Sequence, residues 1–282
     1  MKTRALLGKC RAGTARPGFT LLELLVVISI IGLLAALAMP VLNNFRPNYT
    51  ASATAQLMDA IARARQLALS QRTTVYMVFV PTNFWGDAAY NVLTQSEQDR
   101  AAKLFDKQLI GYNYVTLRSL GDQPGRPTAR YLDSWRSLPE GAFISYQKFA
   151  LRNNAWFTIY TNNAGGVAVP GFQVFGFSLT DRNLGIPFPS ESEPRFSPNH
   201  PYVSLPYIGF DYLGRLISGR DEVIPLTKGS INFSRGADRK ALAMVPSINE
   251  QPPGNGTNSV TYNVVYIDWL TGRARSMHQE VR

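Results

Sequence analysis

Residue types that carry out catalysis or bind metals are few in this chain and widely spaced. The 282 residues include one cysteine, Cys10, and two histidines, His200 and His278, which lie far apart in the sequence. A zinc site needs several such ligands, and a catalytic triad needs a histidine that supports a nucleophile. Phosphate-binding loops, nucleotide fingerprints and nucleophile elbows are not found either. We therefore expect no enzymatic activity, no metal site and no cofactor.

One carboxylate lies in an unusual environment. Glu23 is inside an apolar run of 21 residues, from Phe19 to Met39. At about 1.5 Å per residue, a helix of this length measures roughly 31 Å, which is about the thickness of the hydrocarbon layer of a bilayer. A carboxylate inside such a span costs on the order of 2.5 to 3.5 kcal/mol. We therefore expect a transmembrane helix in which Glu23 requires a positively charged partner.

A basic leader, residues 1–18, precedes the apolar run. It contains no acidic residue and five basic ones, which are Lys2, Arg4, Lys9, Arg11 and Arg16. Basic residues tend to remain in the cytoplasm, so a single pass would leave the residues beyond Pro40 outside. A secretory signal cleaved after Ala38 and a simple membrane anchor are the alternative interpretations. The long polar leader and Glu23 argue against the first, and Glu23 is not explained by the second.

The boundary between the leader and the apolar run is Gly18-Phe19-Thr20-Leu21-Leu22-Glu23. It resembles the signature of type IV pilins and of the pseudopilins of type II secretion. The resemblance implies cleavage between Gly18 and Phe19 by a prepilin peptidase, N-methylation of Phe19, and pairing of Glu23 with the terminal amine of a neighbouring subunit. Pro40 stands at position 22 of the processed chain, where many pilins have a proline that bends the helix.

Removal of the leader changes the charge balance. The full chain has 29 basic and 19 acidic residues and a formal charge of +10. The leader holds five of the basic residues, so 24 remain against 19 and the processed chain carries about +5. Cys10 is lost as well, so the exported part would not depend on an oxidising compartment.

Apolar residues spaced three and four apart predict a helix from Thr54 to Ser70. Leu57, Ile61 and Ala64 would pack against a sheet, and Arg63 would lie on the opposite, solvated side. Pro47 is expected to interrupt or weaken the helix before this stretch.

The stretch from Thr73 to Val80 is rich in β-branched and aromatic residues and predicts a strand directly after the helix. A short helix is expected from Ser96 to Leu109. Further candidate strands are Ala155–Tyr160, Phe172–Leu179, Tyr207–Tyr212, Ser230–Phe233 and Val260–Asp268. The order predicts a pilin-like α+β fold, in which a long N-terminal transmembrane-plus-amphipathic helix packs on a C-terminal antiparallel β-sheet head.

The expected domain organisation follows from these elements. Residues 1–18 form the leader, 19–40 the transmembrane and assembly helix, 41–72 the exposed half of the N-terminal helix, and 73–282 the β-rich globular head. A long insertion at about 81–202, with loops rich in proline, glycine and serine, carries no assigned role.

Two late segments share one form, an apolar strand followed by Asp, a short turn and Gly-Arg. They are Tyr207–Gly219 and Val264–Met277. Gly214 and Gly272 can adopt the positive φ that a tight turn requires. Together with the helix-to-strand junction, these segments resemble the GspH/FimT branch of minor pseudopilins and minor pilins.

Some minor pilins of that branch bind DNA through a C-terminal Gly-Arg-x-Arg motif, which is similar to Gly272-Arg273-Ala274-Arg275. Side chains two apart on a strand lie on the same side, so Arg273 and Arg275 could contact adjacent phosphates. Asp268 and Glu280 reduce the positive charge there, and a basic edge also serves to discourage strand pairing. The acidic pair Asp221–Glu222 lacks the loop of a calcium site and is expected at the surface.

The predicted function is that of a minor pilin or pseudopilin, a structural subunit of a type IV pilus or a type II secretion pseudopilus. The resemblance implies a place in the inner membrane, with the N-terminus cytoplasmic and the head periplasmic, before assembly. Its implied partners are prepilin peptidase, other pilin subunits, the assembly platform and membrane lipid. One alternative is a DNA-binding minor pilin, and another is a membrane-anchored enzyme that uses the insertion as an active-site loop.

Overall fold

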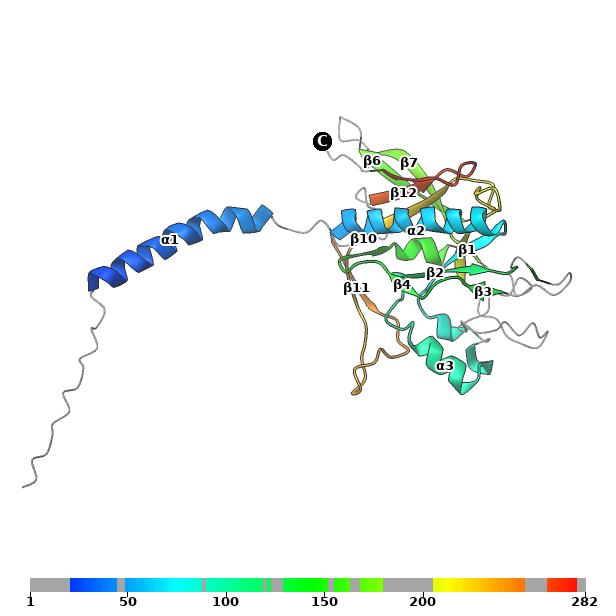
Figure 1. Ribbon diagram of the computed structural model, residues 1–282, viewed down its shortest axis with the longest axis horizontal. Coiled ribbons are helices and arrows are strands. Elements are labelled where there is room, and N and C mark those ends of the chain that lie inside the picture. The colour runs from blue at the N-terminus through cyan, green and yellow to red at the C-terminus, as the bar shows by residue number, and fades with distance from the viewer. Residues whose placement is uncertain are drawn as a thin grey trace, which may run out of the picture. The chain divides into compact units, whose positions relative to one another are not determined.

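The computed structural model describes residues 21–44, 49–87, 90–118, 121–122, 129–151, 155–162, 168–179, 205–251 and 263–277. The chain divides into two compact units, Met1–Pro47 and Asn48–Arg282, and we call the second the head unit. The described part of the first unit is the helix α1 (Leu21–Asn44), and the head unit begins with the helix α2 (Tyr49–Gln71) (Figure 1).

The helix α1 is apolar, and its described side chains face solvent. Every side chain from Leu21 to Leu34 is exposed, and Leu21 is 83% exposed. The helix runs through Pro40 and ends at Asn44. Within the described residues, no helix combines the length and the hydrophobicity that a membrane span requires. The predicted span from Phe19 to Met39 lies partly outside the residues whose side chains are described.

The predicted helix from Thr54 to Ser70 is confirmed as the larger part of α2. Leu57, Ile61 and Ala64 are completely buried, which confirms the predicted apolar stripe. The helix ends where Arg72 adopts a left-handed φ of 49°, and the chain turns directly into the first strand.

The first sheet is antiparallel, with the strand order β3-β2-β1-β9-β8, and β4 also pairs with β2. Its strands are β1 (Val75–Phe79), β2 (Gly111–Thr116), β3 (Arg130–Tyr131), β4 (Arg136–Ser137), β8 (Ser178–Leu179) and β9 (Pro206–Phe210). All residues of β1 and β2 are buried because these strands are central and covered on both faces.

The second sheet has the order β11-β10-β12-β13, and β5 also pairs with β10. Its strands are β5 (Ala142–Ile144), β10 (Glu222–Asn232), β11 (Ser247–Glu250), β12 (Asn263–Ile267) and β13 (Ala274–Met277), and a separate hairpin joins β6 (Trp156–Asn162) to β7 (Ala168–Phe175). Short helices are η1 (Phe84–Gly86), η2 (Tyr90–Val92), α3 (Gln95–Ala102) and α4 (Tyr146–Ala150).

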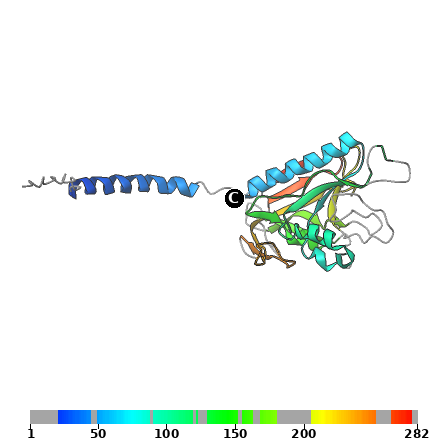
Figure 2. The same ribbon diagram turned by 60° about the horizontal axis from the view of Figure 1, so that its bottom comes forward.

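The main hydrophobic core lies between α2 and the two sheets (Figures 1 and 2). It combines the stripe of α2 with inward-facing residues of β1, β2, β9, β10 and β12. A second cluster, which includes Phe84 and Phe105, covers the other face of β1. The head unit is therefore an α+β fold with antiparallel sheets, which confirms the predicted class for this unit.

Several predicted boundaries are corrected by the structure. The helix expected from Ser96 to Leu109 ends at Ala102, and Leu109 has a positive φ of 65° that excludes a helical backbone. The strand expected from Phe172 to Leu179 is divided between β7 and β8. The strand expected at Ser230–Phe233 is the last part of β10, which begins at Glu222.

Part of the stretch 81–202, which was expected to be an insertion, belongs to the first sheet. β2 lies within this stretch and pairs with β1 along its whole length, from Val75 opposite Thr116 to Phe79 opposite Tyr112. Its sequence, GYNYVT, lacks the apolar run that marks β1, and this is why the sequence did not predict it.

Candidate functional site

The two segments that share the strand-turn-Gly-Arg form are built alike. In the first, a carboxylate oxygen of Asp211 accepts hydrogen bonds from the backbone N–H groups of Leu213 (2.9 Å) and Arg215 (2.8 Å). In the second, Asp268 accepts the N–H of Thr271 at 2.7 Å. The Asp at the end of each strand therefore organises its turn, as Asx turns do.

The two turns also contact each other. The N–H of Leu216 donates to the carbonyl of Trp269 at 2.8 Å. A Cβ atom on Gly272 would lie 2.0 Å from the carbonyl oxygen of Gly214, and both glycines have the predicted positive φ, 63° and 77°. Glycine is therefore required at Gly272 both for its backbone conformation and for this close approach. Arg65 of α2 fixes the pair, since its Nε donates to the carbonyl of Thr271 at 2.7 Å.

The first of these segments departs from the predicted hairpin. Arg273 leads into a complete returning strand, β13, which pairs with β12 from Ala274 to Met277. Arg215 is followed only by a single bridge between Phe210 and Leu216. The likeness of the two segments is therefore a likeness of their turns.

Arg275 in β13 and Arg273, the residue just before this strand, are both exposed, and β13 is the last strand in the order of the second sheet. Ala274, between them, packs against the main core. The guanidinium of Arg275 stacks over the ring of Tyr266 at 4.5 Å, a cation–π contact. The Tyr266 hydroxyl in turn donates to Asp221.

Acidic groups balance part of this charge. Hydrogen bonds from Thr271 lower the pKa of Asp268, which keeps its carboxylate ionised beside Arg275. Asp211 forms an ion pair with Arg215 at 2.9 Å. Arg273 and Arg275 are exposed, and the carboxylates of Asp211 and Asp268 accept hydrogen bonds within their own turns.

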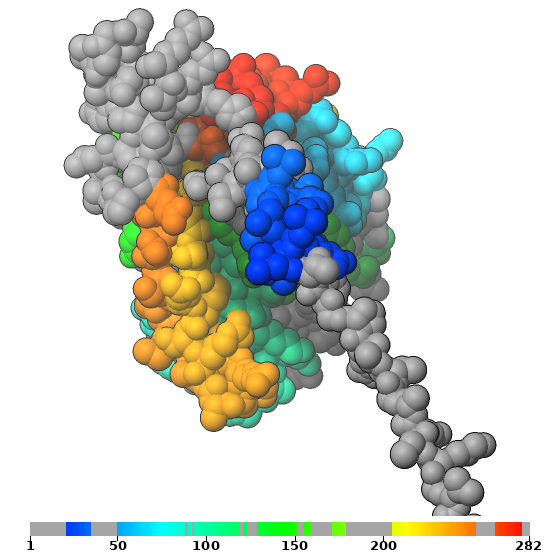
Figure 3. All heavy atoms as spheres, turned by 90° about the vertical axis from the view of Figure 1, so that its left-hand side faces the viewer, coloured from blue at the N-terminus to red at the C-terminus, as the bar shows by residue number. Residues whose placement is uncertain are grey.

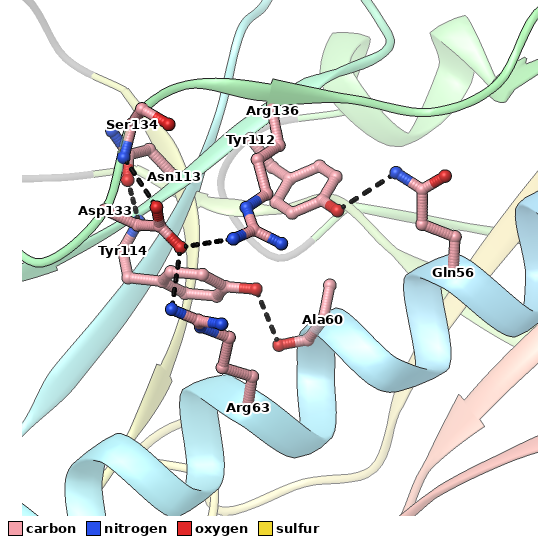
Figure 4. Close-up of polar contacts among 9 residues, drawn as sticks. All are labelled: Gln56, Ala60, Arg63, Tyr112, Asn113, Tyr114, Asp133, Ser134 and Arg136. Carbon is pink, nitrogen blue, oxygen red and sulfur yellow. Dashed lines mark hydrogen bonds and ion pairs between the residues drawn. The ribbon is translucent and has the colours of Figure 1, made fainter.

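A polar cluster attaches α2 to the first sheet (Figure 4). Asp133 accepts ion pairs from Arg63 and Arg136, each at 2.9 Å. The hydroxyl of Tyr114 donates to the carbonyl of Ala60 at 3.0 Å, and burial raises the pKa of this tyrosine. Gln56 donates to the hydroxyl of Tyr112 at 3.2 Å. These contacts fix the position of the helix and give Arg63, predicted on the solvated side, a structural partner.

A buried ion pair joins α4 to the start of β10. Lys148 of α4 and Glu222 of β10 are 0% and 4% exposed at their side chains, and Nζ lies 2.7 Å from Oε2. Nζ also donates to the carbonyl of Phe175 at 2.7 Å. The predicted surface role of Asp221–Glu222 is therefore wrong for Glu222, because a lysine 74 residues away in sequence covers it.

The predicted N-terminal site is described only in part. Gly18 and Phe19 lie outside the described residues, as do Cys10, His200 and His278. Glu23 is in the first turn of α1 and is exposed. Pro40 is inside α1, and its side chain is not among those described. No group of three His, Cys, Asp or Glu residues in the described part of the chain could hold a metal ion.

Comparison with known proteins identifies one family model. Residues 14–39 match the model described as the prokaryotic N-terminal methylation motif, and the matched range includes Gly18, Phe19 and Glu23. No match was found among curated proteins or among solved structures. The chain therefore carries a prepilin-type N-terminal motif, which supports its place in the superfamily of type IV pilins and type II secretion pseudopilins.

Proposed function

We propose that this protein is a minor pilin or pseudopilin, a structural subunit of a type IV pilus or a type II secretion pseudopilus. The observation that carries this proposal is the N-terminal methylation motif at residues 14–39. In this function a prepilin peptidase removes residues 1–18, and the new terminus at Phe19 is N-methylated.

The chemistry of α1 supports an assembly role. Its described side chains, from Leu21 to Leu34, are apolar with few exceptions and exposed, so they require lipid or other apolar helices around them. We propose that the segment Phe19–Met39 holds the subunit in the inner membrane, with the head unit in the periplasm. The same surface then packs against the helices of neighbouring subunits.

Glu23 would set the register of this packing. Cleavage before Phe19 creates an amine, and a neighbouring subunit's amine at Glu23 would neutralise a carboxylate that is costly in an apolar layer. The pair forms only when a processed subunit joins the filament. This pairing therefore favours transfer of the subunit from the bilayer, through the assembly platform, into the filament.

Mass spectrometry of the mature protein tests this function. We expect the chain to begin at an N-methylated Phe19. A mature protein that retains residues 1–18, or one that begins at Met39, would overturn the proposal. Inactivation of prepilin peptidase is the control, and it should leave the full-length precursor in the membrane.

The paired turns support membership in the GspH/FimT branch. Both segments on which that resemblance rests have the Asp-capped turn and the positive-φ glycine, and they meet at Gly214 and Gly272. Minor subunits of this branch are built into the filament in few copies, and a fluorescent count of subunits per filament would test the minor role.

A second candidate function is DNA binding during uptake. It is favoured by the exposure of Arg275, in the edge strand β13, and of Arg273, the residue just before that strand. Contacts to phosphates would be insensitive to base sequence and would weaken with salt. Duplex DNA should bind the protein, and the double variant Arg273→Ala/Arg275→Ala should lose most affinity and flatten the salt dependence. Unchanged binding by this variant would refute the role of the motif.

A further inference from the structure

A small hairpin, residues 234–245, extends the second sheet between β10 and β11. The N–H of Leu242 donates to the carbonyl of Ser234 at 2.8 Å, and the N–H of Gly236 donates to Lys240 at 2.9 Å. Arg239 closes the turn with a positive φ of 62°. We call residues 234–245 the amphipathic hairpin. Hydrogen bonds within the hairpin hold its backbone in one conformation, so its side chains form a surface of fixed shape.

Four consecutive apolar residues of the hairpin, 242–245, are exposed. Leu242 is 43% exposed, Met244 52% and Val245 56%. The buried Gln108 donates to the carbonyl of Met244 at 3.2 Å and fixes the run in place. Such a run on a globular surface marks a site of interaction.

The same hairpin is basic. It contains Arg235, Arg239 and Lys240 against one acid, Asp238, so its net charge is 3 − 1 = +2. Lys240 lies 3.5 Å from Asp238, and both side chains remain largely exposed. Basic residues beside exposed aliphatic residues are the combination that binds an anionic lipid surface, where the cations meet headgroups and the aliphatic chains enter the interface.

The hairpin lies at the end of the head unit where α2 begins. β10 starts opposite Ile267, next to the Asp268 turn, and further along it pairs with β5. Shortly before β5, the carbonyl of Ser137 accepts a hydrogen bond from Gln56, which lies near the start of α2. Figure 3 looks at this end of the head unit, where the gold and orange region includes the hairpin together with β10 and β11. Four residues, 45–48, join α1 to α2, so this end is the tethered one.

We propose that the amphipathic hairpin binds the anionic surface of the membrane and holds the head unit against it before assembly. The inference rests on the proposed function, because the membrane anchor supplies the surface. Nucleic acid is the less suitable partner, since the hairpin has no aromatic residue on which bases could stack. A weak contact suffices here because the anchor keeps the membrane within reach.

Binding of the head fragment, residues 49–282, to vesicles tests the proposal. Among the residues that the structure describes, the fragment keeps every buried core residue, from Ala53 to Ile267, and it corresponds to the second compact unit, so it retains the core needed to fold alone. We expect it to bind phosphatidylglycerol vesicles and not phosphatidylcholine vesicles. Arg239→Ala/Lys240→Ala should weaken binding roughly 30-fold. Arg118→Ala/Arg130→Ala, a change of two exposed arginines just after β2 and in β3, is the matched control of equal charge change and should bind as the wild type does.

A fluorescent label distinguishes insertion from electrostatic attraction alone. The fragment contains no cysteine, so Met244→Cys and the control Ser218→Cys can each carry one environment-sensitive dye. We expect a blue shift with phosphatidylglycerol vesicles at position 244 only. Equal binding to both vesicle types, no shift at position 244, or an Arg239/Lys240-dependent affinity for duplex DNA in place of vesicles would overturn the inference. Circular dichroism verifies that each variant is folded. The test is independent of processing at Phe19, so its failure leaves the proposed function intact.

Discussion

The buried ion pair between Lys148 and Glu222 allows a quantitative test of the packing of the head unit. Burial lowers the pKa of Lys148, and the carboxylate of Glu222 opposes that effect. In the Glu222→Leu variant, the ammonium group of Lys148 would keep its hydrogen bond to the carbonyl of Phe175, at 2.7 Å, and lose its counterion. Removing one partner of a buried pair typically costs about 3 to 5 kcal/mol, because an uncompensated charge stays buried. We expect this loss in the free energy of unfolding.

The double variant Lys148→Met/Glu222→Leu should be much more stable than the single variant Glu222→Leu, because no charge is left buried. It removes both charges and fills the space with apolar atoms, so its stability should lie within about 1 to 2 kcal/mol of the wild type, the remaining loss being the unpaired carbonyl of Phe175. The two changes are therefore strongly non-additive. A double variant as unstable as the sum of its singles would refute the idea that the pair acts as a unit.

Urea unfolding of the head fragment measures these differences. At about 2 to 4 °C per kcal/mol for a domain of this size, the Glu222→Leu variant should also melt roughly 6 to 20 °C lower. Lys240→Ala is the control, because its ion pair with Asp238 is exposed and should contribute nothing measurable. A Glu222→Leu variant with an unchanged midpoint would show that the pair does not stabilise the fold.

Three further predictions concern the anchor and the turns. Glu23→Ala should leave membrane insertion and cleavage unchanged and reduce incorporation into filaments, as measured by the subunit content of sheared filaments; normal incorporation would reject the registry role. Gly272→Ala should destabilise the head by more than about 1 kcal/mol, because its Cβ meets the carbonyl of Gly214, whereas Gly219→Ala, with positive φ and open space, should cost less in a urea titration. The pKa of Asp268 is lowered on folding, so its contribution to stability is present above the ordinary pKa of aspartate and is lost as the pH falls through the lowered value; Asp268→Asn should flatten that part of the stability curve.

Local patterns in the sequence were sufficient for several elements. Leu57, Ile61 and Ala64 recur at helical spacing, and no other arrangement places them on one face, so the buried stripe of α2 was predicted. The positive φ of Gly214 and Gly272 was predicted because the backbone conformation of a turn depends on a residue and its close neighbours in sequence. The N-terminal motif, likewise, is contiguous in sequence and needs no fold to be recognised.

Other features depend on residues that are distant in sequence. β2 is a buried central strand in which the hydroxyl groups of Tyr112 and Tyr114 find partners on α2, and these partners make the burial of both tyrosines favourable. The first part of β10 was missed because Glu222 looks like a surface residue until Lys148 is placed beside it.

The sequence by itself determined the α+β class, the amphipathic face of α2 and the prepilin-type motif, since each follows from the spacing of neighbouring residues. Only the tertiary structure decided that the two Gly-Arg turns meet at Gly214 and Gly272, and that the apolar run of the amphipathic hairpin is exposed. The sequence alone suggests that an apolar residue is buried in the core. Whether it is buried depends on whether another helix or strand packs over it, and only the tertiary structure shows this.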